Sequence, residues 1–169
     1  MEVNLILADY ANMLANIGTI YLRLDRYDHA IESLEKAERM MRRSKTKHKK
    51  SDQQIVQTDI PLAWVLNNLA TAKCLREEHK ASLECYWEAI KVARAHDGES
   101  SKRETANALY NVGRIGVLRK DSEMAMFALT KSLELETKLC GPKSIQIVDT
   151  LNLIGFVHYQ KGEFERAIS

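Results

Sequence analysis

Residues 14–37 read LANIGTIYLRLDRYDHAIESLEKA and contain the pattern that the rest of the chain repeats. Around Gly18, the apolar residues Leu14, Ile17 and Tyr21 share one face of a helix, because their spacing follows the 3.6-residue period. After a polar turn, one face of a second helix carries a small, a large and a small residue: Ala30, Leu34 and Ala37. Small residues let two helices approach and large ones fill the grooves between them, so this segment predicts a helix-turn-helix hairpin.

The same pattern occurs four times along the chain. The small residue that anchors each copy is Gly18, Ala70, Gly113 or Gly155, and a leucine stands four residues before each anchor, at Leu14, Leu66, Leu109 and Leu151. A second small residue follows twelve positions later, at Ala30, Ser82, Ala125 and Ala167. A hairpin of this kind cannot bury its apolar face alone, so neighbouring copies must stack.

The small-large-small signature across a helix pair resembles the tetratricopeptide repeat. The anchors are 52, 43 and 42 residues apart, whereas the common repeat has about 34 residues. Spacing near 42 resembles the longer repeat of kinesin light chains, as do the segments Leu66-Asn67-Asn68-Leu69-Ala70 and Leu139-Cys140-Gly141-Pro142. The resemblance implies an all-α fold, a right-handed α-solenoid of antiparallel helix-turn-helix hairpins. It also implies a protein-binding scaffold or adaptor, with cargo or motor adaptation as a special case.

We expect a single array over residues 1–169. Its repeats cover about 5–43, 59–97, 101–140 and 144–169, and a basic insertion occupies 44–58. Ser101 and Glu104 have the spacing of a capping box at the start of the third repeat. The fourth repeat ends soon after its second helix begins, so we expect Leu151, Ile154 and Val157 to lose part of their cover. The chain is then a fragment of a longer array, or a partner or a second copy covers this end.

The composition is that of a soluble globular protein, with 45% hydrophobic and 28% charged residues and a formal charge of +2. No apolar run is long enough to predict a membrane span, and no basic residue precedes the apolar residues 3–8, so we predict neither a membrane association nor a signal peptide. The three cysteines are odd in number, which favours reduced thiols inside the cell. We expect a cytoplasmic protein, with a nuclear location as the alternative because of the basic run described next.

Six of the nine residues 42–50 are basic and none is acidic: Arg42, Arg43, Lys45, Lys47, Lys49 and Lys50. One interpretation is a patch for nucleic acid or another phosphate-rich partner, and another is a nuclear-import signal. The third is a solvated loop next to a helix C-terminus, where basic residues complement the helix dipole. We favour the third and expect no nucleic-acid partner.

The sequence offers no catalytic or metal-binding motif. No histidine lies three or four residues from another histidine or from a cysteine, so the spacing of a zinc site is absent. Cys85 has no histidine at helical spacing, and we interpret it as a packing residue, as we do His158. We predict no cofactor, no metal and no enzymatic activity, with the regulatory array of a longer enzyme as the alternative.

Partner contacts are expected in the concave groove that the first helices of such hairpins line. The face opposite the packing face, at fixed positions relative to each anchor, supplies these groove residues: Asn12, Asn16, Trp64, Asn67, Asn68, Asn107, Tyr110, Asn111, Arg114, Asn152, Phe156 and Tyr159. The predicted ligand is a peptide or a partner protein.

Asparagine recurs two residues before the anchor, at Asn16, Asn68 and Asn111. An amide both donates and accepts, so such a row would bind a peptide backbone, with the aromatic residues as anchors. The alternative is that these amides hold neighbouring helices together. Arrays that bind chaperone tails carry lysines and an arginine on this face. Ala15, Thr19, Asn107 and Asn111 take the corresponding places and only Asn68 matches, so we do not expect a chaperone tail as the ligand.

Overall fold

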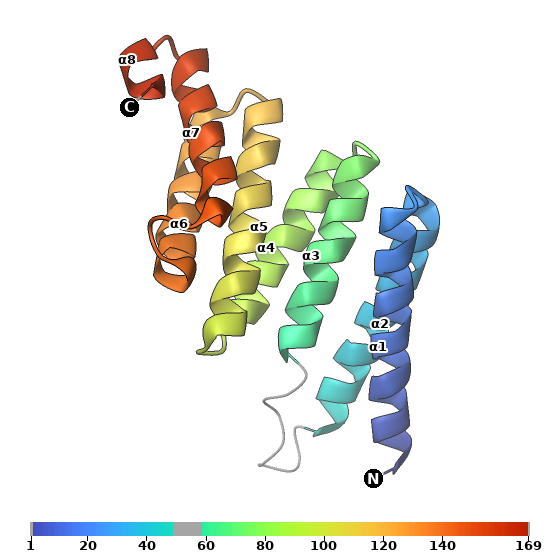
Figure 1. Cartoon of the computed structure of the whole chain (residues 1–169). Coiled ribbons are helices and arrows are strands. Elements are labelled where there is room, and N and C mark those ends of the chain that lie inside the picture. The colour runs from blue at the N-terminus through green and yellow to red at the C-terminus, as the bar shows by residue number, and fades with distance from the viewer. Residues whose placement is uncertain (1, 49–58, 169) are drawn as a thin grey trace. The chain divides into compact units, whose positions relative to one another are not determined.

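The protein is described by a computed structural model for residues 2–48 and 59–168, and every regular element in these two ranges is a helix. Six long helices form three antiparallel hairpins, and a shorter fourth hairpin follows. The elements are α1 (Glu2–Arg23), α2 (Tyr27–His48), α3 (Asp59–Leu75), α4 (His79–Arg94), α5 (Glu99–Leu118), α6 (Ser122–Cys140), the 3-10 helix η2 (Ile145–Ile147), α7 (Val148–Gln160) and α8 (Phe164–Ala167) (Figure 1). The all-α array of consecutive hairpins predicted from the sequence is confirmed.

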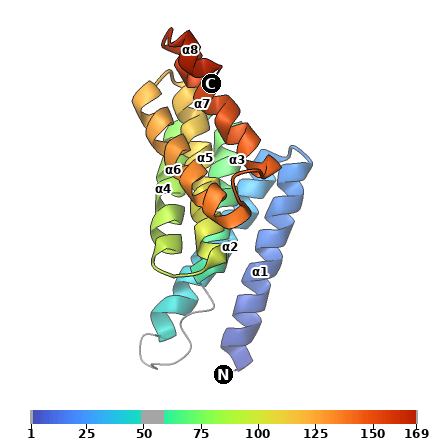
Figure 2. The same ribbon diagram turned by 60° about the vertical axis from the view of Figure 1, so that its left-hand side comes forward.

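The chain divides into two compact units, Met1–His96 and Asp97–Ser169. The first contains the hairpins α1–α2 and α3–α4, and the second contains α5–α6 and α7–α8 (Figure 2). The helix α2 continues to His48, beyond the end near Arg43 that the sequence suggested. Of the predicted insertion 44–58, residues 49–58 lie outside the described residues.

The core of the first unit follows the predicted signature. Ala30, Leu34 and Ala37 are completely buried, together with Leu66 and Leu69 of the next hairpin. Gly18 is required because a Cβ atom there would lie 2.6 Å from Cγ of Leu34. Ion pairs also join the two hairpins at the rim of this core, among them Lys73 to Glu35 at 3.3 Å and Arg76 to Asp28 at 2.6 Å.

The core of the second unit repeats this arrangement. Ala125 and Leu129 of α6 are completely buried, and a Cβ atom at Gly113 would lie 2.5 Å from Cγ of Leu129. Val157 of α7 is also completely buried against these residues. The expectation that Val157 loses cover is therefore wrong, because α6 and α5 already enclose it; Leu151, by contrast, is 45% exposed.

Each hairpin turns through a residue in the left-handed conformation, seven positions after its anchor. These residues are Asp25 (φ 55°), Glu77 (φ 63°), Lys120 (φ 58°) and Gly162 (φ 77°). The next backbone N–H donates to the carbonyl oxygen five residues earlier, at 2.9 Å in all four turns. This is the hydrogen bond of a Schellman motif, which ends a helix and satisfies its last carbonyls.

One helix start is capped by an aspartate side chain, and another corrects a prediction from the sequence. Asp121 caps α6, because its Oδ1 accepts a hydrogen bond from the N–H of Met124 at 3.0 Å. The capping box at Ser101 and Glu104 is wrong. The helix α5 already begins at Glu99 after the cap residue Gly98, so Ser101 lies within its first turn and is buried.

Candidate functional site

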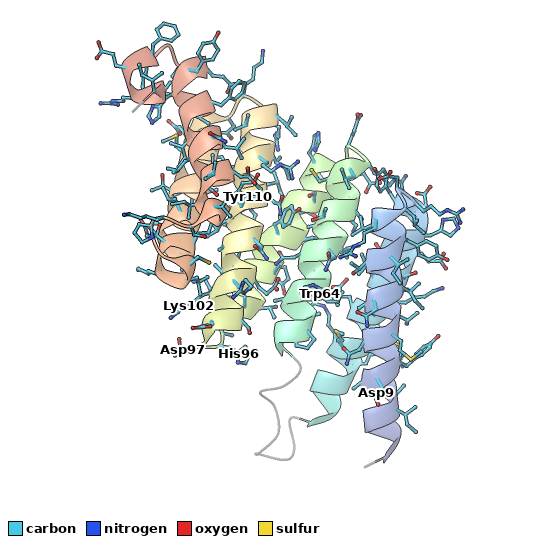
Figure 3. All side chains as sticks on the ribbon, viewed as in Figure 1. Asp9, Trp64, His96, Asp97, Lys102 and Tyr110 are labelled. Atoms are coloured by element: carbon cyan, nitrogen blue, oxygen red, sulfur yellow. The ribbon has the colours of Figure 1, made fainter. Side chains whose placement is uncertain are left out.

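In the first unit, the predicted groove residues lie on the neighbouring helices α1 and α3. Asn12 and Asn16 of α1 are exposed, and Trp64 and Asn68 of α3 are partly buried. Figure 3 labels Trp64 on α3. Asn67 is only 7% exposed, so it offers little surface to a ligand.

In the second unit, the corresponding residues lie on α5 and α7, which also contact each other. Asn107 and Arg114 of α5 are exposed, and Tyr110 and Asn111 are partly buried. The three residues on α7 are all exposed: Asn152, Phe156 and Tyr159. A larger share of the predicted groove residues is therefore exposed in the second unit than in the first.

Two asparagines of the predicted row make the same local hydrogen bond. Nδ2 of Asn68 donates to the carbonyl oxygen of Trp64, and Nδ2 of Asn111 donates to that of Asn107, each at 3.0 Å. Both bonds stay within one helix, so they do not hold neighbouring helices together. An asparagine amide has two N–H donors and an accepting oxygen, so capacity for a peptide remains. Asn16 is exposed on α1.

Three polar and aromatic side chains of α5 contact one another and form a small cluster. The guanidinium of Arg114 lies 5.9 Å from the ring centroid of Tyr110, and its Nη1 donates to Oδ1 of Asn111 at 3.1 Å. Partial burial raises the pKa of the Tyr110 hydroxyl, with Arg114 opposing that shift and Asp149 and Glu136 adding to it. Tyr110 therefore remains a neutral donor, and Arg114 presents a positioned cation.

A row of aromatic rings continues from α7 to α8. The rings of Phe156 and Tyr159 are 6.3 Å apart, and those of Tyr159 and Phe164 are 5.7 Å apart in an edge-to-face arrangement. All three side chains are exposed, at 46%, 59% and 62%. Phe164 is not among the predicted groove residues, because it lies on the second helix of its hairpin. Its place two residues after the turn glycine, Gly162, was the available signal.

Part of the predicted basic patch is engaged within the protein. Nε of Arg42 lies 2.9 Å from Glu38, and Nη1 lies 3.5 Å from Glu88 of α4. Arg43 is exposed on α2, Lys45 and Lys47 lie within α2, and Lys49 and Lys50 fall outside the described residues. The two carboxylates beside Arg42 reduce its electrostatic attraction for a phosphate. This arginine therefore does not support the nucleic-acid alternative.

The described residues contain no group of three or more histidine, cysteine or acidic side chains arranged to hold a metal ion. Cys85 packs against the core of the first unit, and burial raises the pKa of its thiol, as suits a packing residue. His158 is partly buried, with Nδ1 2.6 Å from Oε2 of Glu163. None of the described helices is long and apolar enough to cross a membrane.

Comparison with known protein families gives two matches along the chain. One model of the tetratricopeptide repeat matches residues 11–40, within the first hairpin, and another matches residues 62–99, from α3 to the first residue of α5. The chain carries tetratricopeptide repeats. Repeats of this family mediate protein–protein interactions. A comparison with curated protein sequences finds no significant match.

Solved structures share the fold of this tetratricopeptide-repeat chain. The crystal structure titled BtubC (BKLC) from P. vanneervenii is similar with a TM-score of 0.63 and 18% sequence identity. The match covers 98% of this chain and 67% of that chain. At this identity the likeness shows the fold alone.

Proposed function

We propose that this chain is a non-catalytic protein-interaction scaffold or adaptor that binds a peptide segment on the α5–α7 face of its second unit. The observation that carries the proposal is the contact of Arg114 with both Tyr110 and Asn111. An arginine fixed by an amide and a ring loses little conformational freedom on binding, and such preorganisation strengthens a complex. Arginine and tyrosine are also common among the residues that dominate binding energy.

The chemistry of this face favours a peptide with an acidic residue next to an apolar one. The guanidinium of Arg114 would donate to a carboxylate or to a backbone carbonyl oxygen. One repeat further, Phe156 takes the position that Arg114 takes on α5, so the two helices offer a cation and then an aromatic ring at equivalent places. The exposed amides of Asn107 and Asn152 would bind the peptide backbone.

The face formed by α1 and α3 in the first unit is a weaker candidate for the peptide-binding site. Trp64 and Asn68 are partly buried, and Asn67 is buried. Adaptation of a cargo to a motor remains a special case of the proposal, supported by the repeat spacing near 42 residues.

The test begins with a random peptide library displayed on phage and selected against the 169-residue chain. Dissociation constants of the selected peptides are then measured by fluorescence anisotropy for three variants. Arg114→Ala and Phe156→Ala should each weaken binding by roughly tenfold or more, as expected for residues that dominate an interface. The matched control is Phe127→Ala, an exposed aromatic on α6 that is 57% exposed, and it should change little.

Thermal unfolding followed by circular dichroism serves as the second measurement. All three side chains are exposed, so the midpoints should stay within a few degrees of the wild type. Peptides that bind both α5–α7 variants as tightly as the wild type would refute the proposal, as would a library that yields no binding peptide.

A further inference from the structure

The helix α1 carries a continuous row of exposed apolar side chains on the side that its own hairpin leaves open. Its members are Ile6 (65% exposed), Tyr10 (52%), Met13 (59%), Ile17 (40%), Ile20 (56%) and Leu24 (59%). Leu24 follows the last residue of α1 directly, and its N–H still donates to the carbonyl oxygen of Ile20 at 3.1 Å. We refer to these six residues as the α1 stripe. Scattered exposed hydrophobic residues are ordinary, but a contiguous apolar row marks an interaction surface.

The α1 stripe is distinct from the face with which α1 packs in its own unit. That face is formed by Ala11, Ala15 and Gly18, which are buried. The stripe residues follow one another at intervals of four, three, four, three and four, which is the alternation of a coiled-coil seam. At 1.5 Å per residue the seam is about 27 Å long. Such a seam fits another helix of the same spacing.

We propose that the α1 stripe binds the α1 stripe of a second copy of this chain, with the two helices antiparallel. A two-fold axis near residue 15 would bring every stripe residue against another one. Ile6 would face Leu24 of the partner subunit, Tyr10 would face Ile20 of the partner subunit, and Met13 would face Ile17 of the partner subunit. Each of the six stripe residues then contacts a stripe residue of the partner subunit, and each of the three pairs occurs twice by symmetry.

The charges beside the stripe fit this pairing and set its direction. Asp9 and Arg23 lie on the same flank, each seven residues from Asn16, and Figure 3 labels Asp9 on α1. Both are exposed, and neither forms an ion pair with any residue in 2–48 or 59–168. The antiparallel arrangement brings Asp9 next to Arg23 of the partner subunit, twice by symmetry, and the two copies of Asn16 together. A parallel arrangement would leave Asp9 and Arg23 about 21 Å apart along the axis.

A membrane surface is a poorer occupant for the same row. Helices that lie in a membrane interface usually carry several lysines or arginines beside the apolar face. Arg23 is the only basic residue of α1. The opposite charges at the two ends of the flank complement a second copy instead.

Sedimentation velocity over a range of protein concentrations tests this proposal on the whole 169-residue chain. The wild type should form dimers that dissociate on dilution. Met13→Glu and Ile20→Glu should each raise the dimer dissociation constant by roughly 100-fold or more, because each places two carboxylates in an apolar seam. The matched control Phe127→Glu changes an equally exposed residue on α6 and should leave the dimer intact. Circular dichroism should show that the variants remain helical.

Charge reversal tests the direction of the helices at low ionic strength. Asp9→Arg alone and Arg23→Asp alone should each weaken the dimer by roughly tenfold, because like charges then meet twice. The double variant Asp9→Arg/Arg23→Asp should regain the wild-type constant. A chain that stays monomeric at every concentration would overturn the proposal, as would a dimer indifferent to Met13→Glu or a double variant no tighter than the single ones.

Discussion

At the scale of single residues, the close approach of the two helices of each hairpin depends on small residues, among them the glycine or alanine at the anchor. Gly116 of α5 is the sharpest example, because a Cβ atom there would lie 2.8 Å from the backbone nitrogen of Ala125 and 2.9 Å from its Cα. Backbone atoms cannot rotate away as a flexible side chain would. The contact therefore fixes how close α5 and α6 lie.

Gly116→Ala should destabilise the protein in spite of the better helix propensity of alanine. The gain in propensity is about 1 kcal/mol, whereas forced overpacking costs typically 1–3 kcal/mol or more. Urea denaturation followed by circular dichroism should show a net loss of up to about 2 kcal/mol. Gly155→Ala is the matched comparison, since its Cβ would meet only the carbonyl group of Ala167, at 3.1 Å from the oxygen, and α8 contains no buried residue. A more stable Gly116→Ala protein would contradict this account of the contact.

At the scale of helices and turns, all four hairpins have a left-handed residue at the same repeat position, although only the last of these residues is a glycine. The left-handed conformation costs a non-glycine residue about 1–2 kcal/mol, and glycine avoids this cost. Part of the advantage is lost, because glycine gives up more conformational freedom on folding. The turns are therefore places where the sequence is not at its most stable.

Lys120→Gly should stabilise the second unit by about 0.5–1 kcal/mol, because it removes the strain at φ 58°. The reciprocal change Gly162→Ala, at φ 77°, should destabilise the last hairpin by a similar amount. Thermal unfolding midpoints of the two variants should move in opposite directions. Shifts of the same sign would show that the turn geometry does not control stability here.

The helices could be predicted well from the sequence, whereas some of their ends could not. The period of the apolar residues and the repeated small residues predicted the position of every hairpin. Both patterns follow from the need to pack two helices closely. The start of α5 was misplaced since Gly98 allows the helix to begin at Glu99, ahead of the serine that has the better capping side chain. The continuation of α2 to His48 was missed because its basic residues suggested an end.

At the scale of the whole molecule, burial depends on which hairpins are neighbours, and a single repeat cannot reveal this. Ile17 and Leu69 occupy the same position in the first and second repeats, yet Ile17 is 40% exposed and Leu69 is 1% exposed. Leu69 packs into the core that α3 shares with α1 and α2, whereas Ile17 lies in the α1 stripe, outside that core. The α1 stripe could not be predicted from the repeat pattern, because that pattern makes the four copies equivalent.

The candidate site was predictable only in part for a related reason. Repeat positions identified Tyr110, Asn111 and Arg114 as neighbours on one face of α5, because helical geometry alone requires it. The contact of Arg114 with both other side chains depends on rotamers, which spacing does not specify. The local hydrogen bonds of Asn68 and Asn111 likewise became apparent only from the geometry.

The most direct test of peptide binding on the α5–α7 face is an NMR titration of the 15N-labelled 19.3 kDa chain with a peptide selected from the library. The binding account predicts that the largest changes in amide chemical shift lie in residues 107–114 of α5 and 152–159 of α7. Changes concentrated in α2, α4 and α6, with residues 107–114 and 152–159 unaffected, would contradict it.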